Sequence, residues 1–198
     1  VFDGYDNNEL SGVRVVALVQ DGQEVESASA GSEVEVVLDR TPFYAEMGGQ
    51  VGDKGILRSA NETVQIFDTK RENNLPIHLT KQLPENPAAD FRAIIDLEAR
   101  RGSEANHTAT HLIDQALREV LGSHVEQKGS LVTPDYLRFD FSHYNKLTPE
   151  EIRQVEELVT QAVRADYPRE EHRNIPIAEA RAMGAMALFG EKYGEENS

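Results

Sequence analysis

The chain has 198 residues, of which 39% are hydrophobic, so it is long enough for one large domain or two small ones. It contains no cysteine, which excludes disulfides, thiol catalysis and thiolate ligands within this sequence and predicts a reducing compartment, the cytoplasm. The formal net charge of −15 argues against a surface that coats nucleic acid generally. No apolar run approaches the roughly 18 residues of a transmembrane helix, so no membrane association is expected. The start at Val1 resembles neither a signal peptide nor an initiator, which predicts a cut fragment.

The first half of the chain alternates apolar and polar residues between turn signals, a pattern typical of short strands. Their regular spacing predicts a small β-barrel domain over residues 1–95. The expected strands cover 13–20, 33–39, 55–58, 62–70, 77–81 and 91–95, with a turn at Asp21-Gly22. Between Ile95 and Arg101 the period changes from two to 3.6, which marks the expected boundary to a second domain, 96–198.

The second half mixes helical and strand patterns, which predicts an antiparallel sheet packed with helices and an α+β fold class overall. A helix is expected over 103–121, followed by strands over 123–132 and 136–141. Thr148-Pro149-Glu150-Glu151 is a capping box that opens an amphipathic helix ending near Tyr167-Pro168. The alanine-rich stretch 178–186 predicts another helix, interrupted by Gly184.

Two histidines four residues apart, His107 and His111, are the most informative feature of the expected helix over 103–121. The apolar residues of this helix fall within one stripe nearly opposite both imidazoles, which predicts that the histidines point away from the core. They can converge on one metal ion, although two solvated histidines on one face remain an alternative. A metalloprotease motif is excluded because Thr108 stands where the general-base glutamate belongs. The stripe consists of Ala105, Ala109, Leu112, Ile113, Ala116 and Val120.

Other polar residues are weaker candidates for a site. Gln127 lies on an apolar strand face, where its amide should bond either to backbone or to a ligand. The run from Gly48-Gly49 to Gly55 is no Walker loop and predicts a tight turn, although its glycines allow a ligand to approach closely. Local nucleic-acid contacts could come from Arg100, Arg101 and Lys128, or these could be ordinary solvated residues. The remaining histidines, His78, His124, His143 and His172, are expected to be structural or exposed.

Several motifs together resemble the editing region of the alanyl-tRNA synthetases, nearly from end to end. They are TPFYAEMGGQ at 41–50, HTATH at 107–111, HVEQKGS at 124–130, LRFDFSH at 137–143 and GAMALFGEKYG at 184–194. The two-histidine motif alone is also shared with threonyl-tRNA synthetase editing domains and with free-standing alanyl editing proteins. Jointly the motifs are specific.

The resemblance implies a hydrolytic site that cleaves the ester of wrongly made seryl- or glycyl-tRNA(Ala). The family holds zinc with the two histidines, here His107 and His111, and a downstream Cys-x-x-x-His that this chain lacks, which predicts absent or weak zinc binding. By resemblance, Thr110 and Gln127 match positions that shape substrate recognition, and they are the expected catalytic residues. Gly48 and Gly49 are expected to line the substrate because glycine allows close approach, and Arg100, Arg101 and Lys128 are expected to contact the tRNA acceptor end. ATP and Mg²⁺ are implied only for the parent ligase.

Three readings of function follow. The first is the editing portion of an alanine-specific ligase that acts as an aminoacyl-tRNA deacylase. The second is a tRNA-binding or structural fragment whose histidines have no catalytic role, because half a metal site binds metal poorly. The third is a free-standing editing protein.

Overall fold

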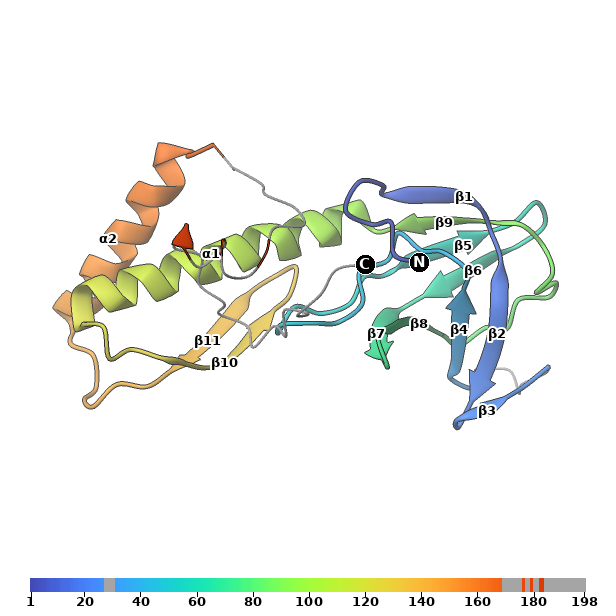
Figure 1. The fold of residues 1–198 in the computed structure, drawn as a ribbon, viewed down its shortest axis with the longest axis horizontal. Coiled ribbons are helices and arrows are strands. Elements are labelled where there is room, and N and C mark those ends of the chain that lie inside the picture. The colour runs from blue at the N-terminus through green and yellow to red at the C-terminus, as the bar shows by residue number, and fades with distance from the viewer. Residues whose placement is uncertain (27–30, 169–175, 177–178, 180–181, 184–198) are drawn as a thin grey trace. The chain divides into compact units, whose positions relative to one another are not determined.

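The computed structural model describes residues 1–26, 31–168, 176, 179 and 182–183, and the fold is α+β as predicted. The chain forms two compact units. The first comprises Val1–Glu104 and Thr133–Tyr136, and the second comprises Ala105–Val132 and the chain from Leu137 onward. Helix α1 (Leu97–Leu121) begins in the first unit and continues in the second (Figure 1). No helix of the described residues combines the length and the apolar character needed to cross a membrane.

The first unit contains two antiparallel sheets (Figure 1). One has the strand order β3-β2-β4-β8-β7 and the other the order β1-β9-β5-β6. Their strands are β1 (Glu9–Val13), β2 (Val15–Gln20), β3 (Gln23–Glu24), β4 (Val34–Leu38), β5 (Gly55–Arg58), β6 (Thr63–Ile66), β7 (Asp68–Glu72), β8 (Leu75–Thr80) and β9 (Phe91–Ile95).

Side chains that alternate along these strands build the core of the first unit. In β4, every second residue from Val34 to Leu38 is buried, and β9 repeats this pattern from Phe91 to Ile95. The same core includes Val13, Leu18, Phe43, Leu57, Val64 and Ile66. The strand bounds predicted for 55–58 and 91–95 are confirmed. The turn at Asp21-Gly22 is also confirmed, with φ values of +51° and +73° that suit a two-residue hairpin between β2 and β3.

The predicted β-barrel is wrong in its closure, because the described strands pair into two open sheets. These pairings end at the edge strands β1 and β6 in one sheet and β3 and β7 in the other. The predicted strand over 62–70 divides at Phe67, whose N–H donates to Leu79 O at 3.0 Å. The chain leaves one sheet and enters the other at this corner and again between Val13 and Val15. Alternation continues through both corners, so sequence pattern alone could not reveal them.

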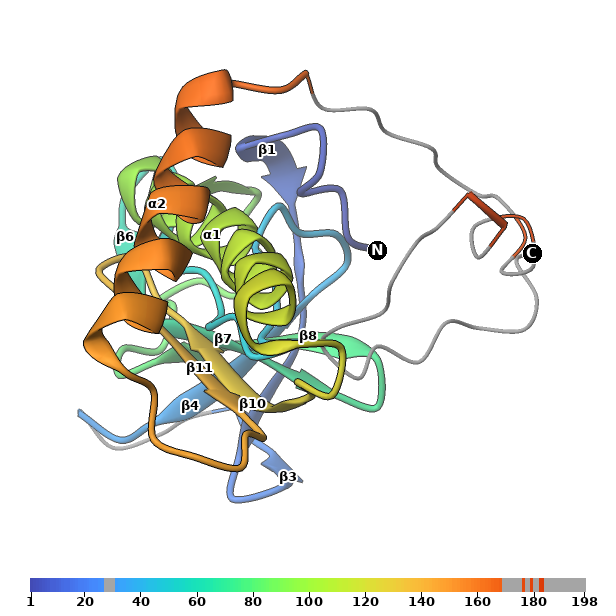
Figure 2. The same cartoon turned by 90° about the vertical axis from the view of Figure 1, so that its left-hand side faces the viewer.

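The second unit contains the remainder of α1, a hairpin and helix α2 (Figures 1 and 2). The hairpin strands are β10 (Gln127–Val132) and β11 (Leu137–Phe141), shorter than predicted at their N-terminal ends. Helix α2 (Pro149–Ala165) opens with the predicted capping box, in which Thr148 Oγ1 accepts from the Glu151 N–H at 3.2 Å. It ends at Asp166, which has φ +46°. The helix predicted over 178–186 lies largely outside the described residues.

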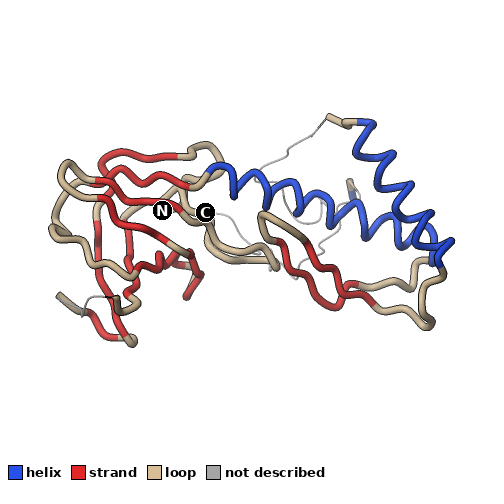
Figure 3. Tube along the Cα trace, turned by 180° about the vertical axis from the view of Figure 1, so that it is seen from behind, coloured by secondary structure: helices blue, strands red, loops and turns tan. Residues whose placement is uncertain are grey.

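The buried face of α1 in the second unit differs from the predicted apolar stripe. Thr110 and Asp114 are 0% exposed, whereas Ala105, a predicted core residue, is exposed. At about 100° per residue, His107 and His111 lie within about 60° of Asp114 around the helix axis. The prediction that these histidines point away from the core is therefore wrong, and they border a buried side that combines Thr110 and Asp114 with the apolar Leu117. The tube view in Figure 3 shows the course of α1 beside the hairpin.

Candidate functional site

The rings of His107 and His111 lie side by side on α1, one turn apart. Their centroids are 5.4 Å apart and their planes differ by 24°. Neutral imidazoles at this spacing suit one zinc ion, which takes three or four protein ligands. Within the described part of the chain, no group of three or more His, Cys, Asp or Glu side chains could hold a metal ion. His107 and His111 are two ligands where such a site takes three or four, so zinc binding stays a prediction.

Thr110 directly precedes His111 and is fully buried. Its hydroxyl donates to Asn106 O, one turn earlier, at 2.9 Å. This bond uses the one hydroxyl proton and leaves the oxygen lone pairs able to accept from another group. Toward a ligand, the Thr110 hydroxyl can therefore act only as an acceptor. Because Thr110 is fully buried, a group that donates to it must be enclosed as well.

Asp114 is a buried carboxylate of the same helix face that the sequence reasoning missed. Its Oδ2 accepts from Arg118 Nε at 3.1 Å, and its Oδ1 is buried with no hydrogen-bond partner in the part of the chain that the structure describes. A buried acceptor without a donor costs about 1–3 kcal/mol. The four-residue spacing of Asp114 and Arg118 was the available signal, because it is typical of helical ion pairs.

Gln127 begins β10 and is half-buried. Its Oε1 is buried and has no hydrogen-bond partner among the described residues. The structure therefore does not show the alternative in which this oxygen accepts a hydrogen bond from the backbone. An unpartnered buried amide oxygen is typical of a position where a water or ligand donates.

Gly48 and Gly49 belong to the first unit and form the predicted tight turn. Their φ values are +61° and +83°, and the residues on either side, Met47 and Gln50, exchange backbone hydrogen bonds at 3.1 and 3.2 Å. Positive φ at both central residues favours glycine. This geometry accounts for the two glycines by turn conformation, and a role in lining a substrate site remains a prediction.

The base of this glycine loop is closed by a buried ion pair between Asp53 and Arg100. Asp53 Oδ2 accepts from the Tyr44 N–H at 2.8 Å, and both Asp53 oxygens accept from the Arg100 guanidinium. The guanidinium also donates to Gly4 O and to Pro42 O, each at 3.0 Å. Arg100 is 6% exposed, so its donors bond inside the first unit rather than to phosphate. The tRNA contact expected of Arg100 stays a prediction, and the guanidinium is already bonded within the first unit.

The other two basic candidates are exposed. Arg101 lies on the surface of α1, and Lys128 Nζ lies 2.9 Å from Glu126 Oε2. Both positions are open to a polyanion, and the contact itself remains a prediction.

His78 lies beneath the segment that leads into the glycine loop, and it is structural, as expected. Because Val36 O can only accept, His78 Nδ1 carries the proton and donates to it at 2.9 Å. Nε2 then accepts from Thr41 Oγ1 at 2.7 Å. Complete burial disfavours the charged imidazolium and lowers the pKa of His78 to about 4. The neutral ring thus ties β8 to β4 and to the segment at Thr41.

Comparison with known proteins places these residues in a family. The family model described as tRNA synthetases class II (A) matches residues 1–98. An alanine–tRNA ligase from Bacteroides thetaiotaomicron is 66% identical over 161 residues, which cover 81% of this chain and 18% of that protein. Another from Flavobacterium psychrophilum is 52% identical over 203 residues, which cover 98% of this chain and 22% of that protein. The chain belongs to the alanyl-tRNA synthetase family.

The match to alanyl-tRNA synthetases concerns one segment of a long protein. The chain spans 18% to 22% of the length of these relatives. The family model ends at residue 98, close to the start of α1, whereas the match to the Flavobacterium psychrophilum ligase continues through the second unit. The match to this ligase therefore covers both units.

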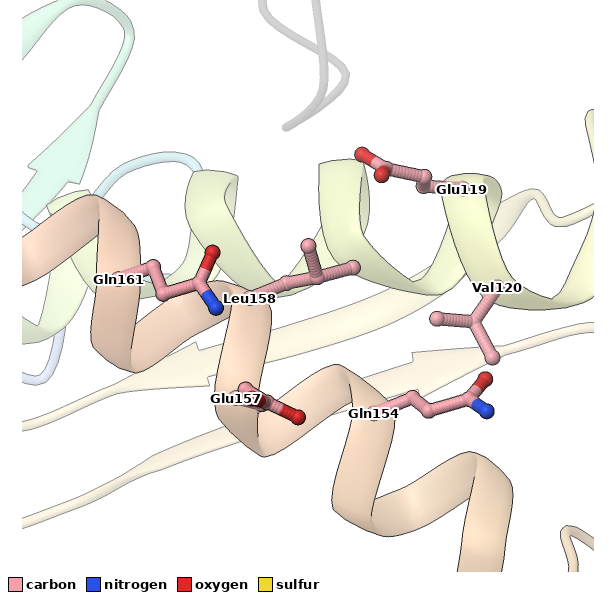
Figure 4. A pocket seen from close by; sticks show the side chains of 6 residues that line it. All are labelled: Glu119, Val120, Gln154, Glu157, Leu158 and Gln161. Carbon is pink, nitrogen blue, oxygen red and sulfur yellow. The ribbon is translucent and has the colours of Figure 1, made fainter.

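A groove of about 350 Å³ lies between α1 and α2 of this alanyl-tRNA synthetase segment (Figure 4). Its apolar part comes from Val120 and Leu158. None of the candidate site residues is among the described residues that line it, so it is separate from the histidine pair. The lining consists of Glu119, Val120, Gln154, Glu157, Leu158 and Gln161.

Proposed function

We propose that this chain is the editing segment of an alanine–tRNA ligase and hydrolyses the ester of seryl- or glycyl-tRNA(Ala). Water attacks the ester carbonyl, the acyl–oxygen bond breaks, and the free amino acid and tRNA(Ala) leave. In the parent enzyme, other segments join alanine to tRNA(Ala) with ATP. Family membership and the HTATH and HVEQKGS motifs support this proposal.

The observation that carries the proposal is the unpartnered Oε1 of Gln127. It lies in the unit that also contains the histidine pair and the buried Thr110. An oxygen without a donor is costly in a purely structural module and useful where a substrate or water supplies the donor. This observation favours a ligand site in the second unit over a fragment whose polar residues have no role.

Editing has a physical reason in a ligase for alanine. A synthetic site cannot strongly reject an amino acid that differs by one small group, because such a difference is worth only about 1–3 kcal/mol. A second site must therefore recognise the error by its chemistry. In this proposal Thr110 accepts from the serine hydroxyl, and Gln127 holds substrate or water.

The test is single-turnover hydrolysis of seryl-, glycyl- and alanyl-tRNA(Ala) by a full-length ligase that carries this segment. The unmodified protein is expected to release serine and glycine faster than alanine. Thr110→Val and Gln127→Leu each remove one hydrogen-bonding group at nearly constant size. Each is expected to slow the seryl reaction about ten- to hundredfold, as the loss of a contact worth about 1–3 kcal/mol predicts, and to slow the alanyl reaction less.

Gln115→Ala is the matched control, because Gln115 is an exposed residue of the same helix. It is expected to leave all three rates unchanged. Zinc content is measured in every variant. Equal losses on seryl and alanyl esters, or losses that follow zinc content, would return Thr110 and Gln127 to structural roles. A full-length protein that hydrolyses none of the esters would contradict the proposed function itself.

A further inference from the structure

Three aromatic rings gather at the open ends of the hairpin in the second unit, apart from the candidate site. His124 precedes β10, and His143 and Tyr144 follow β11. The centroids of His124 and Tyr144 are 5.0 Å apart and their planes differ by 22°. His143 lies 5.1 Å from His124, at 26°. We call these three rings the aromatic platform.

Hydrogen bonds and close packing hold the aromatic platform in one arrangement. A hydrogen bond of 2.9 Å joins His124 Nε2 to His143 Nδ1, so one imidazole donates to the other. Ser142 N–H donates to Glu126 O at 3.0 Å and ties together the two segments that carry the rings. Gly122 approaches His124 so closely that a Cβ there would lie 3.1 Å from Nδ1. The platform is therefore formed before any ligand arrives.

Tyr144 is the outermost ring and is 85% exposed. An aromatic side chain that is stacked on one neighbour and open to solvent offers its remaining surface to a planar ligand. Packing does not require this residue to be aromatic, because it contributes almost no buried area. The exposed ring and its ordered support thus point to a function in binding.

The charges near the platform favour a planar ligand held by stacking over one held by its phosphates. Glu126 is paired with Lys128, Glu151 interacts electrostatically with His143, and the chain as a whole carries a net charge of −15. Stacking of a nucleobase on an aromatic ring is worth about 1–3 kcal/mol per base, in addition to any contacts that a protein makes to the phosphates.

We propose that the aromatic platform of His124, His143 and Tyr144 stacks with a base of the single-stranded 3′ end of tRNA. This inference rests on the proposed function, which brings that end of the tRNA to the second unit. The contact would position the acceptor end and is separate from the ester chemistry. Because any base has a flat π-face, the contact is expected to tolerate different bases.

The experiment measures binding of the full 198-residue chain to a fluorescein-labelled single-stranded RNA ending in CCA. Fluorescence anisotropy gives the affinity of the unmodified chain and of Tyr144→Leu, Tyr144→Phe and Tyr136→Leu. Base–aromatic stacking is worth about 1–3 kcal/mol, so Tyr144→Leu is expected to weaken binding about 5- to 150-fold. Tyr144→Phe keeps the ring and should keep the affinity. Tyr136→Leu is the matched control, since Tyr136 is also exposed, at 55%.

A second measurement separates stacking from binding elsewhere. Addition of the RNA should shift the ring-proton signals of Tyr144 upfield in the NMR spectrum and leave those of Tyr136 in place. No detectable binding, equal affinity of Tyr144→Leu and the unmodified chain, or equal weakening by Tyr136→Leu would overturn the platform. If hydrolysis by the full-length ligase persists in that case, the proposed function stands. If RNA binding depends on Tyr144 while no ester is hydrolysed, the platform stands and the proposed function fails.

Discussion

Buried polar residues have different surroundings in the two units. In the first unit, Arg100 and His78 each bond to several groups, and those partners bond to backbone in turn. In the second unit, one oxygen of Asp114 and one of Gln127 are buried without a donor. Complete bonding stabilises a structure, whereas an unpartnered acceptor lowers stability unless a ligand or water supplies the donor. This contrast favours the second unit as the place of chemistry and the first as its support.

At the residue scale, His78 is expected to make folding stability depend on pH. Its pKa is about 4 in the folded chain against 6.5 for the free side chain, so only the unfolded state takes up a proton near pH 6. Stability contributed by neutral His78 is therefore present above pH 6.5 and lost as the pH falls toward 4. The expected loss between about pH 7.5 and pH 5 is about 2 kcal/mol.

Urea unfolding at these two pH values measures the effect, and His78→Asn supplies the comparison because asparagine does not titrate. The carboxylates contribute equally to both proteins, so the difference between the two pH dependences isolates the imidazole. Parallel pH dependences for the unmodified chain and His78→Asn would contradict the assignment of a buried neutral ring.

At the element scale, strand and helix positions followed from local pattern, whereas the buried polar contacts did not. The bounds of β5 and β9 and the capping box of α2 depend on neighbouring residues, which the sequence displays directly. The pair of Asp53 and Arg100 joins residues 47 positions apart, and no periodicity signals it. The polar buried side of α1 was missed because apolar periodicity assigns burial to hydrophobic residues alone. The histidine pair itself was recognisable because its spacing matches one helical turn.

The first turn of α1 gives an element-scale prediction, because Arg100 connects it to the glycine loop. Arg100→Met leaves the Asp53 carboxylate buried without its cation, and loss of one partner of a buried pair costs about 3–5 kcal/mol. Chemical unfolding of the chain should show this loss. Arg92→Met is the control, since its pair with Glu9 is about half exposed and should be worth less than about 1 kcal/mol. Similar losses in both variants would show that burial of the Arg100 pair has no special effect.

At the scale of the whole molecule, composition limits what this segment can do by itself. The net charge of −15 gives no general attraction to RNA, so the proposed binding of tRNA must depend on local contacts. The absence of cysteine likewise limits the metal ligands available within the chain. Zinc-dependent chemistry is thus expected to need ligands from outside these 198 residues, which span about a fifth of the length of the relatives.

Zinc content gives the whole-molecule prediction. The 198-residue chain is expected to hold zinc weakly or not at all, because His107 and His111 supply two ligands where such sites use three or four. A full-length ligase carrying the segment, with the downstream Cys-x-x-x-His that the family resemblance implies, should retain one zinc per chain after dialysis against a mild chelator.

His107→Ala in that protein is expected to lower zinc content and abolish seryl-tRNA(Ala) hydrolysis. Because His107 is partly exposed, the variant should keep its unfolding free energy within about 1 kcal/mol. Gln115→Ala, on the same helix, should change neither quantity. Stoichiometric zinc in the dialysed 198-residue chain would mean that other residues complete the site, and unfolding of His107→Ala would make His107 a structural residue.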